Sequence, residues 1–168
     1  EKSAPQYIEG EGVLLWGTEY PLTVVRIMHG KAYAERTADK IVLYMSKGAD
    51  TAVRRGAIHA LYRAELAAEM QKQAPICERL VGRCAALWRI RIMKTRWGSC
   101  NTRTGAITLN LRLVRYNVNA LIYVMIHELT HLWVRGHNAH FYERMDRYFP
   151  TWRKVRHELN QWDADEYL

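Results

Sequence analysis

The stretch ALIYVMIHELTHLWVR, residues 120–135, decides the fold, because it is apolar on most sides when it is wound into a helix. A helix of this kind is buried in the interior of a domain instead of lying on its surface. Gly136 follows at once, and we expect it to end the helix in the left-handed conformation that glycine adopts without strain. The stretch therefore predicts a central buried helix with the rest of the chain packed around it.

Two histidines and a glutamate interrupt this apolar helix in the pattern H-E-x-x-H. His127 and His131 are four residues apart, so they share one helix face and can both bind one Zn²⁺. Glu128 points about 100° round the helix, where it can take a proton from a water molecule instead of binding the metal. Burying these groups is costly unless they have partners. The pattern predicts a catalytic zinc site, although Mn, Ni or Co also suit histidine ligands.

A catalytic zinc needs a third protein ligand and an open fourth position. His137 is the first choice, because it lies six residues after His131 and the glycine before it lets the chain fold back toward the metal. His140 is an alternative three residues further on, and Glu143 and Glu158 are carboxylate alternatives downstream. The residues alone leave these alternatives open.

The segments around the central helix alternate between the two periodicities of regular structure. We predict a hairpin over residues 12–27 and a strand over 41–45. A helix follows from an N-cap at Asp50, and we expect Pro75 to break or kink it before a shorter helix. Neighbouring antiparallel strands over 88–94 and 106–114 come next, and the last elements are helices over 140–148 and 152–162. The order indicates an α+β fold with a small antiparallel sheet packed on helices. We expect a single domain over residues 1–168, with a β-rich part (1–46) and a helical, metal-binding part (50–162).

The composition is that of an ordinary globular protein of 168 residues, with 49% hydrophobic and 25% charged residues. No apolar run approaches the roughly 18 residues that span a bilayer, so we expect no membrane segment. Three cysteines, Cys77, Cys84 and Cys100, form no C-x-x-C pair, which argues against a disulfide framework and a zinc ribbon. A reducing cytoplasm is the location that this cysteine pattern favours.

Positive charge gathers in one part of the chain. The net charge is +8, and residues 79–115 hold nine Lys or Arg and no acidic residue, whereas the tail QWDADEYL is acidic. Such a stretch attracts anions, including nucleotides and nucleic acid. The H-E-x-x-H pattern with a third histidine favours a zinc-dependent peptidase, and the basic stretch suggests two further functions beside it. One is a metal-dependent hydrolase of nucleotide phosphoanhydrides that uses the same site, and the other is a nucleic-acid-associated protease or binding module.

Several motifs in consecutive order carry a family resemblance. They are TRWGSC (95–100), ITLNLRL (107–113), IYVMIHELTHL (122–132), GHNAHFY (136–142) and YFPTWRKVRHEL (148–159). Together they resemble the YgjP-like metallopeptidase family, which is related to the SprT-like and WLM zinc proteases. The resemblance implies a zincin-like fold, a peptide or protein substrate, zinc on His127, His131 and His137, and Glu128 as the catalytic base.

The chain departs from the family pattern at three places. Gly136 stands where the family usually has Asn, Tyr142 where it usually has Trp, and RYNVN (115–119) where a Pro is common. None of these positions belongs to the implied ligand set, so we expect them to affect the shape of the loops around the site.

The RWGSC segment (residues 96–100) has two interpretations. Arg96 or Trp97 shapes the substrate cleft, or the segment is a turn around its glycine, with the tryptophan on the core, Ser99 as a cap and Cys100 buried. We favour the turn. In zincin-like folds a strand near the metal helix pairs with extended substrate, and ITLNLRL is the candidate for that strand.

Overall fold

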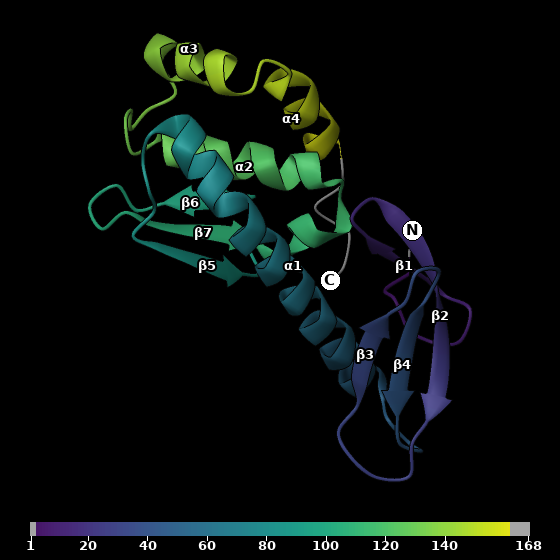
Figure 1. Ribbon diagram of the computed structural model, residues 1–168. Coiled ribbons are helices and arrows are strands. Elements are labelled where there is room, and N and C mark those ends of the chain that lie inside the picture. Colours follow the sequence, from purple (N-terminus) through teal and green to yellow (C-terminus); the bar gives the residue numbers. More distant parts are fainter. Residues whose placement is uncertain (1–2, 162–168) are drawn as a thin grey trace.

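The computed structural model describes residues 3–161, and its elements follow the predicted order β, α, β, α (Figure 1). The elements are β1 (Gly12–Leu15), β2 (Thr18–Arg26), β3 (Tyr33–Arg36), β4 (Ile41–Met45), α1 (Thr51–Val81), β5 (Leu87–Arg91), β6 (Gly98–Cys100), β7 (Ala106–Asn110), the 3₁₀ helix η1 (Leu111–Arg115), α2 (Val118–Thr130), α3 (Ala139–Tyr148) and α4 (Trp152–Asn160). The α+β class is confirmed. The acidic tail lies outside the described residues.

The β-rich part forms a four-stranded sheet in the order β1-β2-β4-β3. The predicted hairpin is confirmed, since β1 and β2 pair antiparallel around a turn in which Trp16 and Gly17 both have positive φ. Strand β2 then pairs parallel with β4, and β3 pairs antiparallel with β4. Strand β3 was not predicted, because its four residues, YAER, are mostly exposed and show little apolar alternation.

Helix α1 crosses the molecule from the β-rich sheet to the helical part (Figure 1). The predicted N-cap is confirmed, because Asp50 accepts a hydrogen bond from the N–H of Val53 at 2.9 Å. We predicted that Pro75 breaks or kinks the helix, and the break is wrong. Helix α1 continues through Pro75 to Val81, and Gly82, which has a φ of 78°, is its C-cap. Ala74 and Cys77 are buried on either side of the proline, so packing against the core holds the helix together there.

The second sheet has three strands in the order β5-β7-β6. The predicted antiparallel pairing is wrong, because β5 runs parallel to β7, and the short strand β6 between them in sequence is the antiparallel partner. Alternation of apolar residues correctly placed Trp88 and Ile90 on one face, opposite Ile107 and Leu109. Alternation reports which face is buried but not the direction of the neighbouring strand.

Asn110 ends strand β7 earlier than predicted, and residues 111–115 form η1 instead of continuing the strand. Its side chain is 2% exposed and accepts hydrogen bonds from the backbone N–H groups of Arg112 and Met93. Its amide nitrogen donates to the carbonyl oxygens of Met93 and Arg96, at 2.9 and 2.8 Å. One buried side chain thus caps the 3₁₀ helix and fixes the loop that leads into β6.

Helix α2 is the predicted central helix, with Leu121, Met125 and Leu129 fully buried. It ends at Thr130, five residues before the predicted end, and Gly136 does not adopt the left-handed conformation. The hydroxyl of Thr130 donates to the carbonyl of Ile126 at 2.7 Å, and a short turn follows. The prediction of a helix to residue 135 is wrong, because the chain must leave the axis there to carry later residues back over the helix.

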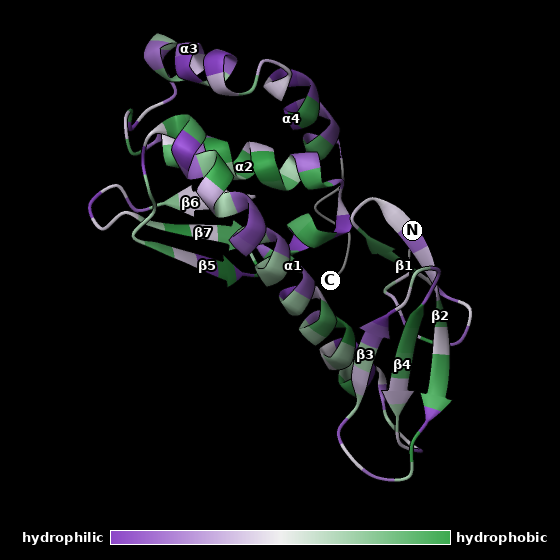
Figure 2. Ribbon diagram, viewed as in Figure 1, coloured by the Kyte–Doolittle hydropathy of each residue, from purple (hydrophilic) through white to green (hydrophobic). Residues whose placement is uncertain are grey.

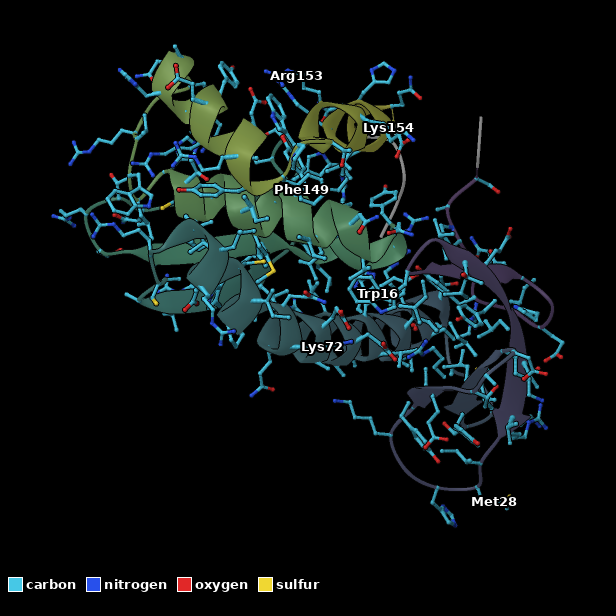
Figure 3. All side chains as sticks on the ribbon, turned by 45° about the horizontal axis from the view of Figure 1, so that its top comes forward. Trp16, Met28, Lys72, Phe149, Arg153 and Lys154 are labelled. Atoms are coloured by element: carbon cyan, nitrogen blue, oxygen red, sulfur yellow. The ribbon has the colours of Figure 1, made fainter. Side chains whose placement is uncertain are left out.

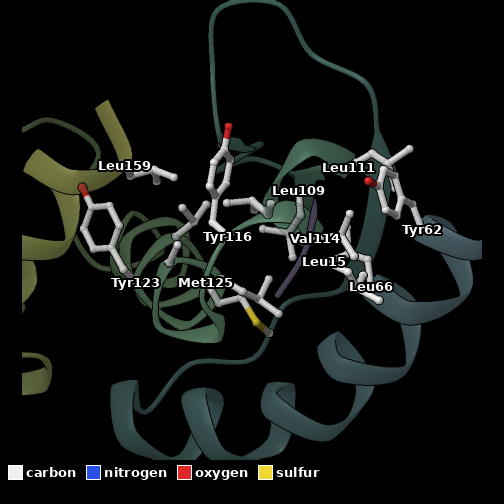
Figure 4. Close-up of a cluster of buried hydrophobic side chains, with 14 of the residues drawn as sticks. Leu15, Tyr62, Leu66, Leu109, Leu111, Val114, Tyr116, Tyr123, Met125 and Leu159 are labelled. Carbon is white, nitrogen blue, oxygen red and sulfur yellow. The ribbon is translucent and has the colours of Figure 1, made fainter. Parts of the chain in front are cut away.

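One cluster of buried side chains extends through both parts of the chain. Figure 4 draws part of it, with Leu15 of β1, Leu66 of α1 and Met125 of α2 among its members. Figure 2 shows α2 as mostly hydrophobic, whereas α3 and α4, which cover it, are largely hydrophilic. The shared core agrees with a single domain, which stays a prediction. Within residues 3–161, no helix is long and apolar enough to cross a membrane.

Candidate metal centre

Three imidazoles converge at the end of α2. His127 lies in its last turn, His131 caps its C-terminus, and His137 lies in the loop before α3. One ring nitrogen of each could bind a metal, and these atoms all lie within 4.8 Å of one another. The Nε2 atoms of His127 and His137 are 3.1 Å apart. Two ligands of a tetrahedral zinc are about 3.3 Å apart when each lies 2.0–2.1 Å from the metal, so this pair fits a shared ion.

Hydrogen bonds at the Nδ1 atoms of His131 and His127 leave the Nε2 atoms of both rings free to bind a metal. Nδ1 of His131 is 3.0 Å from the carbonyl oxygen of Val134. A carbonyl can only accept, so Nδ1 carries the proton and Nε2 is left as a lone-pair ligand. The Tyr123 hydroxyl lies one helical turn before His127, 3.5 Å from its Nδ1, and can accept a weak bond in the same way.

Phe141 forms the floor of the cluster. It lies in the first turn of α3, where the side chain of Asn138 caps the helix by accepting the backbone N–H of Phe141. The Phe141 ring is fully buried, and its centroid is 4.8–4.9 Å from the centroids of all three imidazoles. Sequence reasoning quoted this residue within GHNAHFY but gave it no role. Its position four residues after the third histidine, within the same motif, was the signal that could have found it.

Burial keeps two of the imidazoles, those of His127 and His131, in the form that binds metals. Burial, followed by the charges of His131 and His137, lowers the pKa of His127 to about 3. Burial also lowers the pKa of His131. Neutral imidazole is the ligand form, because protonation removes the lone pair that binds the ion.

Glu128 is buried between α2 and the edge strand β6, with 6% of its surface exposed. Burial raises its pKa to about 7, and the positive charge of Arg96 opposes that rise. A carboxylate with a pKa near neutrality suits a general base that takes up and releases a proton within one catalytic cycle. It lies in the same cleft as the three histidines without being a member of their cluster.

Gly98 makes this burial possible. A Cβ atom at position 98 would lie 2.8 Å from Cγ1 of Val124, 3.1 Å from Cγ of Glu128 and 3.2 Å from the carbonyl oxygen of Thr108. Only a residue without a side chain lets β6 approach α2 so closely. The predicted turn is wrong, because residues 98–100 form strand β6, in which Ser99 pairs with Thr108. The expected packing of Trp97 on the core is confirmed, and Cys100 is partly buried there.

The cleft beside the histidines has a volume of about 510 Å³. Residues 95–100 form one wall, so the segment that we favoured as structural contributes to the site, with Arg96 and Trp97 in the lining. Tyr123 of α2 and Arg156 and Asn160 of α4 also line the cleft and were not predicted to. Tyr123 lies four residues before His127, so helical spacing could have indicated it. Arg156 falls within the family motif YFPTWRKVRHEL but was given no role, and nothing in the sequence pointed to Asn160.

The alternative third ligands lie elsewhere. His140 is exposed and faces Glu143 on α3, with 3.9 Å between Nδ1 and a carboxylate oxygen, in a separate hollow. Glu158 lines a different cavity, on the side of α4 that faces Leu14 and Tyr116. The structure thus brings His137 to His127 and His131 and does not bring the other three candidates there.

The candidate substrate-binding strand is also corrected. ITLNLRL begins in β7, which is the central strand of its sheet and has a partner on both edges. Strands β5 and β6 are the two edges of the sheet, and of these β6 lines the cleft. Free backbone groups for pairing with an extended peptide are therefore on β6 and not on β7.

Residues 1–162 match the family described as YgjP-like, metallopeptidase domain. The chain belongs to the YgjP-like metallopeptidase family. The family membership inferred from the sequence motifs is confirmed, and the chain is a zinc peptidase-like hydrolase. No curated protein matches the chain.

Two of the solved structures that are similar to this YgjP-like protein are metallopeptidase zymogens. Abylysin of Pyrococcus abyssi is 19% identical, with a TM-score of 0.52 over 59% of this chain and 99% of that one. Jannalysin of Methanocaldococcus jannaschii is 19% identical, with a TM-score of 0.49 over 55% of this chain and 94% of that one. The likeness to abylysin confirms the zincin-like fold.

Proposed function

We propose that this chain is a zinc-dependent metallopeptidase in which His127, His131 and His137 hold the ion and Glu128 is the general base. The observation that carries the proposal is the convergence of three imidazole nitrogens within 4.8 Å of one another beside a buried carboxylate. Family membership supports a peptide substrate. Other divalent ions such as Mn, Ni or Co also suit three histidines, and elemental analysis of the purified protein distinguishes them from zinc.

A zinc ion at such a site supplies Lewis acidity, which acidifies a bound water and polarises a substrate carbonyl. Glu128 accepts the proton of the attacking water on its carboxylate and then donates it to the leaving amine. The carbonyl of Val134 holds His131 in one tautomer, and Tyr123 lies where it can do the same for His127. Phe141 excludes water beneath the three rings, so their nitrogens face the cleft.

The free edge of β6 supports the way in which a peptide would bind. An extended peptide can add to this edge as a further strand and bond to its unpaired backbone groups. Gly98 brings the edge against α2 beside Glu128, so a peptide on β6 would pass directly over the proposed base. The proposed substrate is therefore an extended, unfolded segment of a peptide or protein.

Elemental analysis of purified variants tests the ligand set. We expect about one zinc per chain in the wild type and in Glu128→Gln, and much less in His137→Ala. His140→Ala is the matched control, because it removes an exposed histidine of the same segment. Equal zinc in His137→Ala and the wild type would reject His137 as a ligand.

Hydrolysis tests the role of the base. Glu128→Gln should keep its zinc and lose hydrolysis of an unfolded protein such as casein, because the amide cannot take up the proton. Unchanged hydrolysis in Glu128→Gln would contradict the assignment.

A second candidate function is hydrolysis of nucleotide phosphoanhydrides at the same centre. The observation that favours it is the presence of three arginines, Arg96, Arg135 and Arg156, in the lining of the cleft. Guanidinium groups bind phosphate well. A panel of nucleoside triphosphates assayed for phosphate and pyrophosphate release tests it, and no turnover with any of the divalent metals would reject it.

The structure divides the basic stretch 79–115 among several surfaces. Arg83 stacks on Trp133, Arg89 and Arg91 line a hollow on one side of the second sheet, and Arg96 lies in the cleft. A nucleic-acid partner stays a prediction, and salt-dependent binding would test it. We also propose a cytoplasmic location, because Cys77, Cys84 and Cys100 are all free thiols.

A further inference from the structure

Two arginines from different elements reach the cleft of the proposed catalytic centre. Arg96 precedes β6, and Arg156 lies in α4. Both line the cleft that holds the three histidines. Their positive charges act on neighbouring groups of α2. Burial raises the pKa of Glu128, and the charge of Arg96 opposes that rise. Burial also raises the pKa of Tyr123, and the charge of Arg156 opposes it.

The backbone that carries Arg96 is fixed by Asn110. The side-chain amide of Asn110 donates to the carbonyl oxygen of Arg96 at 2.8 Å, and its backbone N–H donates to the carbonyl oxygen of Trp97 at 2.9 Å. Asn110 is itself buried and has further bonds to the same loop. The base of the Arg96 side chain is therefore held in place although its guanidinium is exposed.

A second contact ties this loop to the helix that carries Arg156. The indole Nε1 of Trp97 donates to the side-chain oxygen of Asn160 at 3.3 Å. Trp97 is adjacent to Arg96, and Asn160 lies one helical turn after Arg156, so this bond joins the neighbours of the two arginines. The ring of Trp97 also packs edge-on against Tyr116, which restricts it further.

Neither arginine has an acidic partner among residues 3–161. The ion pairs of that region join Arg36 to Glu65, Lys72 to Glu69, His140 to Glu143 and Arg153 to Asp146. Among the residues that the structure describes, Glu128 is the only acidic one in the lining of the cleft, and the proposed mechanism already uses it. Two guanidinium groups without an acidic partner in residues 3–161, in a cleft that would also hold a divalent cation, repel one another and the ion unless an anion binds there.

We propose that Arg96 and Arg156 form an anion subsite that binds a carboxylate of the substrate, an Asp or Glu side chain or the chain terminus, close to the scissile bond. This inference rests on the proposed peptidase function and names its substrate class. An acidic peptide bound along β6 would place a carboxylate between the two guanidinium groups, which bind such groups through paired hydrogen bonds. Substrates with a neutral side chain at that position would leave both arginines unpaired.

Binding to zinc-loaded Glu128→Gln protein tests the subsite without turnover. The probes are fluorescein-labelled octapeptides of alanine and serine with one glutamate placed at each position in turn and an amidated C-terminus. A matched series carries glutamine in place of glutamate, and one unamidated peptide tests the chain terminus. We expect at least one carboxylate peptide to bind about tenfold or more tightly than its neutral partner, since a charge-assisted hydrogen bond contributes about that factor.

Substitution of the two arginines should remove that preference. In the Glu128→Gln background, Arg96→Gln with Arg156→Gln should bring the carboxylate peptide to the affinity of its neutral partner. Arg63→Gln with Lys154→Gln is the control, because it removes the same charge from exposed positions outside the cleft, one of them on α4 (Figure 3). Arg156→Gln alone serves as a second variant if the pair of substitutions destabilises the fold, and it should reduce the preference several-fold.

Three results would overturn the proposal. They are equal affinity for the carboxylate and neutral peptides, an equal loss in the control, and binding of ATP through both arginines when no carboxylate peptide binds. The last result would assign the subsite to phosphate. Cleavage of the same peptides by the wild type tests the peptidase function separately. A carboxylate preference without cleavage would reject the peptidase, and cleavage without a carboxylate preference would reject the subsite.

Discussion

Replacing Glu128 with Gln should stabilise the metal-free protein at alkaline pH, although it removes the proposed base. The carboxyl group is 6% exposed, and burial raises its pKa from 4.5 to about 7. The folded state therefore holds this proton more tightly than the unfolded chain does. The stability that the protonated carboxyl contributes is fully present below pH 4.5 and is lost as the pH rises through 7.

The size of the effect follows from the two pKa values. The difference between about 7 and 4.5 is about 2.5 pH units, which corresponds to about 3 kcal/mol at 1.36 kcal/mol per unit. Glutamine has the same shape and does not ionise. The free energy of unfolding of Glu128→Gln, measured relative to the wild type, should therefore increase by about 3 kcal/mol between pH 4.5 and pH 9. Titrations elsewhere in the chain cancel in this comparison.

Urea unfolding of both proteins across this pH range, with a chelator present to keep them metal-free, measures the difference. Adding zinc at pH 8 should reverse the order, because the bound ion attracts the carboxylate of the wild type. A difference between the two proteins that does not change with pH would refute the reasoning. It would mean that the buried carboxyl ionises as easily in the fold as in the unfolded chain.

Three further predictions concern the surroundings of the site. Gly98→Ala should cost about 1–3 kcal/mol of stability and reduce kcat, because its Cβ would overlap Val124 and press on Glu128; Gly56→Ala, which meets no atom within 4 Å in helix α1, is the control and should not destabilise in thermal unfolding. Zinc at about 100 times its Kd should stabilise the wild type and His140→Ala by about 2.7 kcal/mol, seen as a higher Tm, and an equal rise in His137→Ala would contradict the ligand set. Trp97→Phe removes the hydrogen bond to Asn160 at a cost of about 1 kcal/mol, and it should raise KM more than it lowers kcat, because the bond positions the wall of the cleft; a loss confined to kcat would contradict that role.

The sequence was sufficient for the features that depend on local spacing. Helical periodicity located α1 and α2, and Asp50 marked the start of α1 correctly. The four-residue spacing of His127 and His131 put both rings on one face, because the geometry of a helix fixes that relation without reference to the rest of the fold. The motifs in order identified the family, which the family comparison confirms.

The errors came where distant parts of the chain compete with local preference. Pro75 predicts a break, but burial of Ala74 and Cys77 on both sides of it keeps α1 continuous. Strand β6 was mistaken for a turn, because three residues are too few to show alternation and their partner in β7 is supplied by the sheet. Because β6 lies between β5 and β7 in the sequence, the chain reverses twice and β5 and β7 run parallel. No residue pattern within either strand indicates this direction.

The sequence by itself determined that this chain buries two histidines and a glutamate on one helix and that a third histidine follows within reach. Only the tertiary structure decided the surroundings of those groups. It brought His137 to the other two histidines, placed Phe141 beneath all three, and packed α4 against the cleft so that Arg156 lines it together with Arg96. The physical reason is that helical geometry sets the positions of residues a few places apart, whereas contacts between distant elements depend on the packing of the whole core.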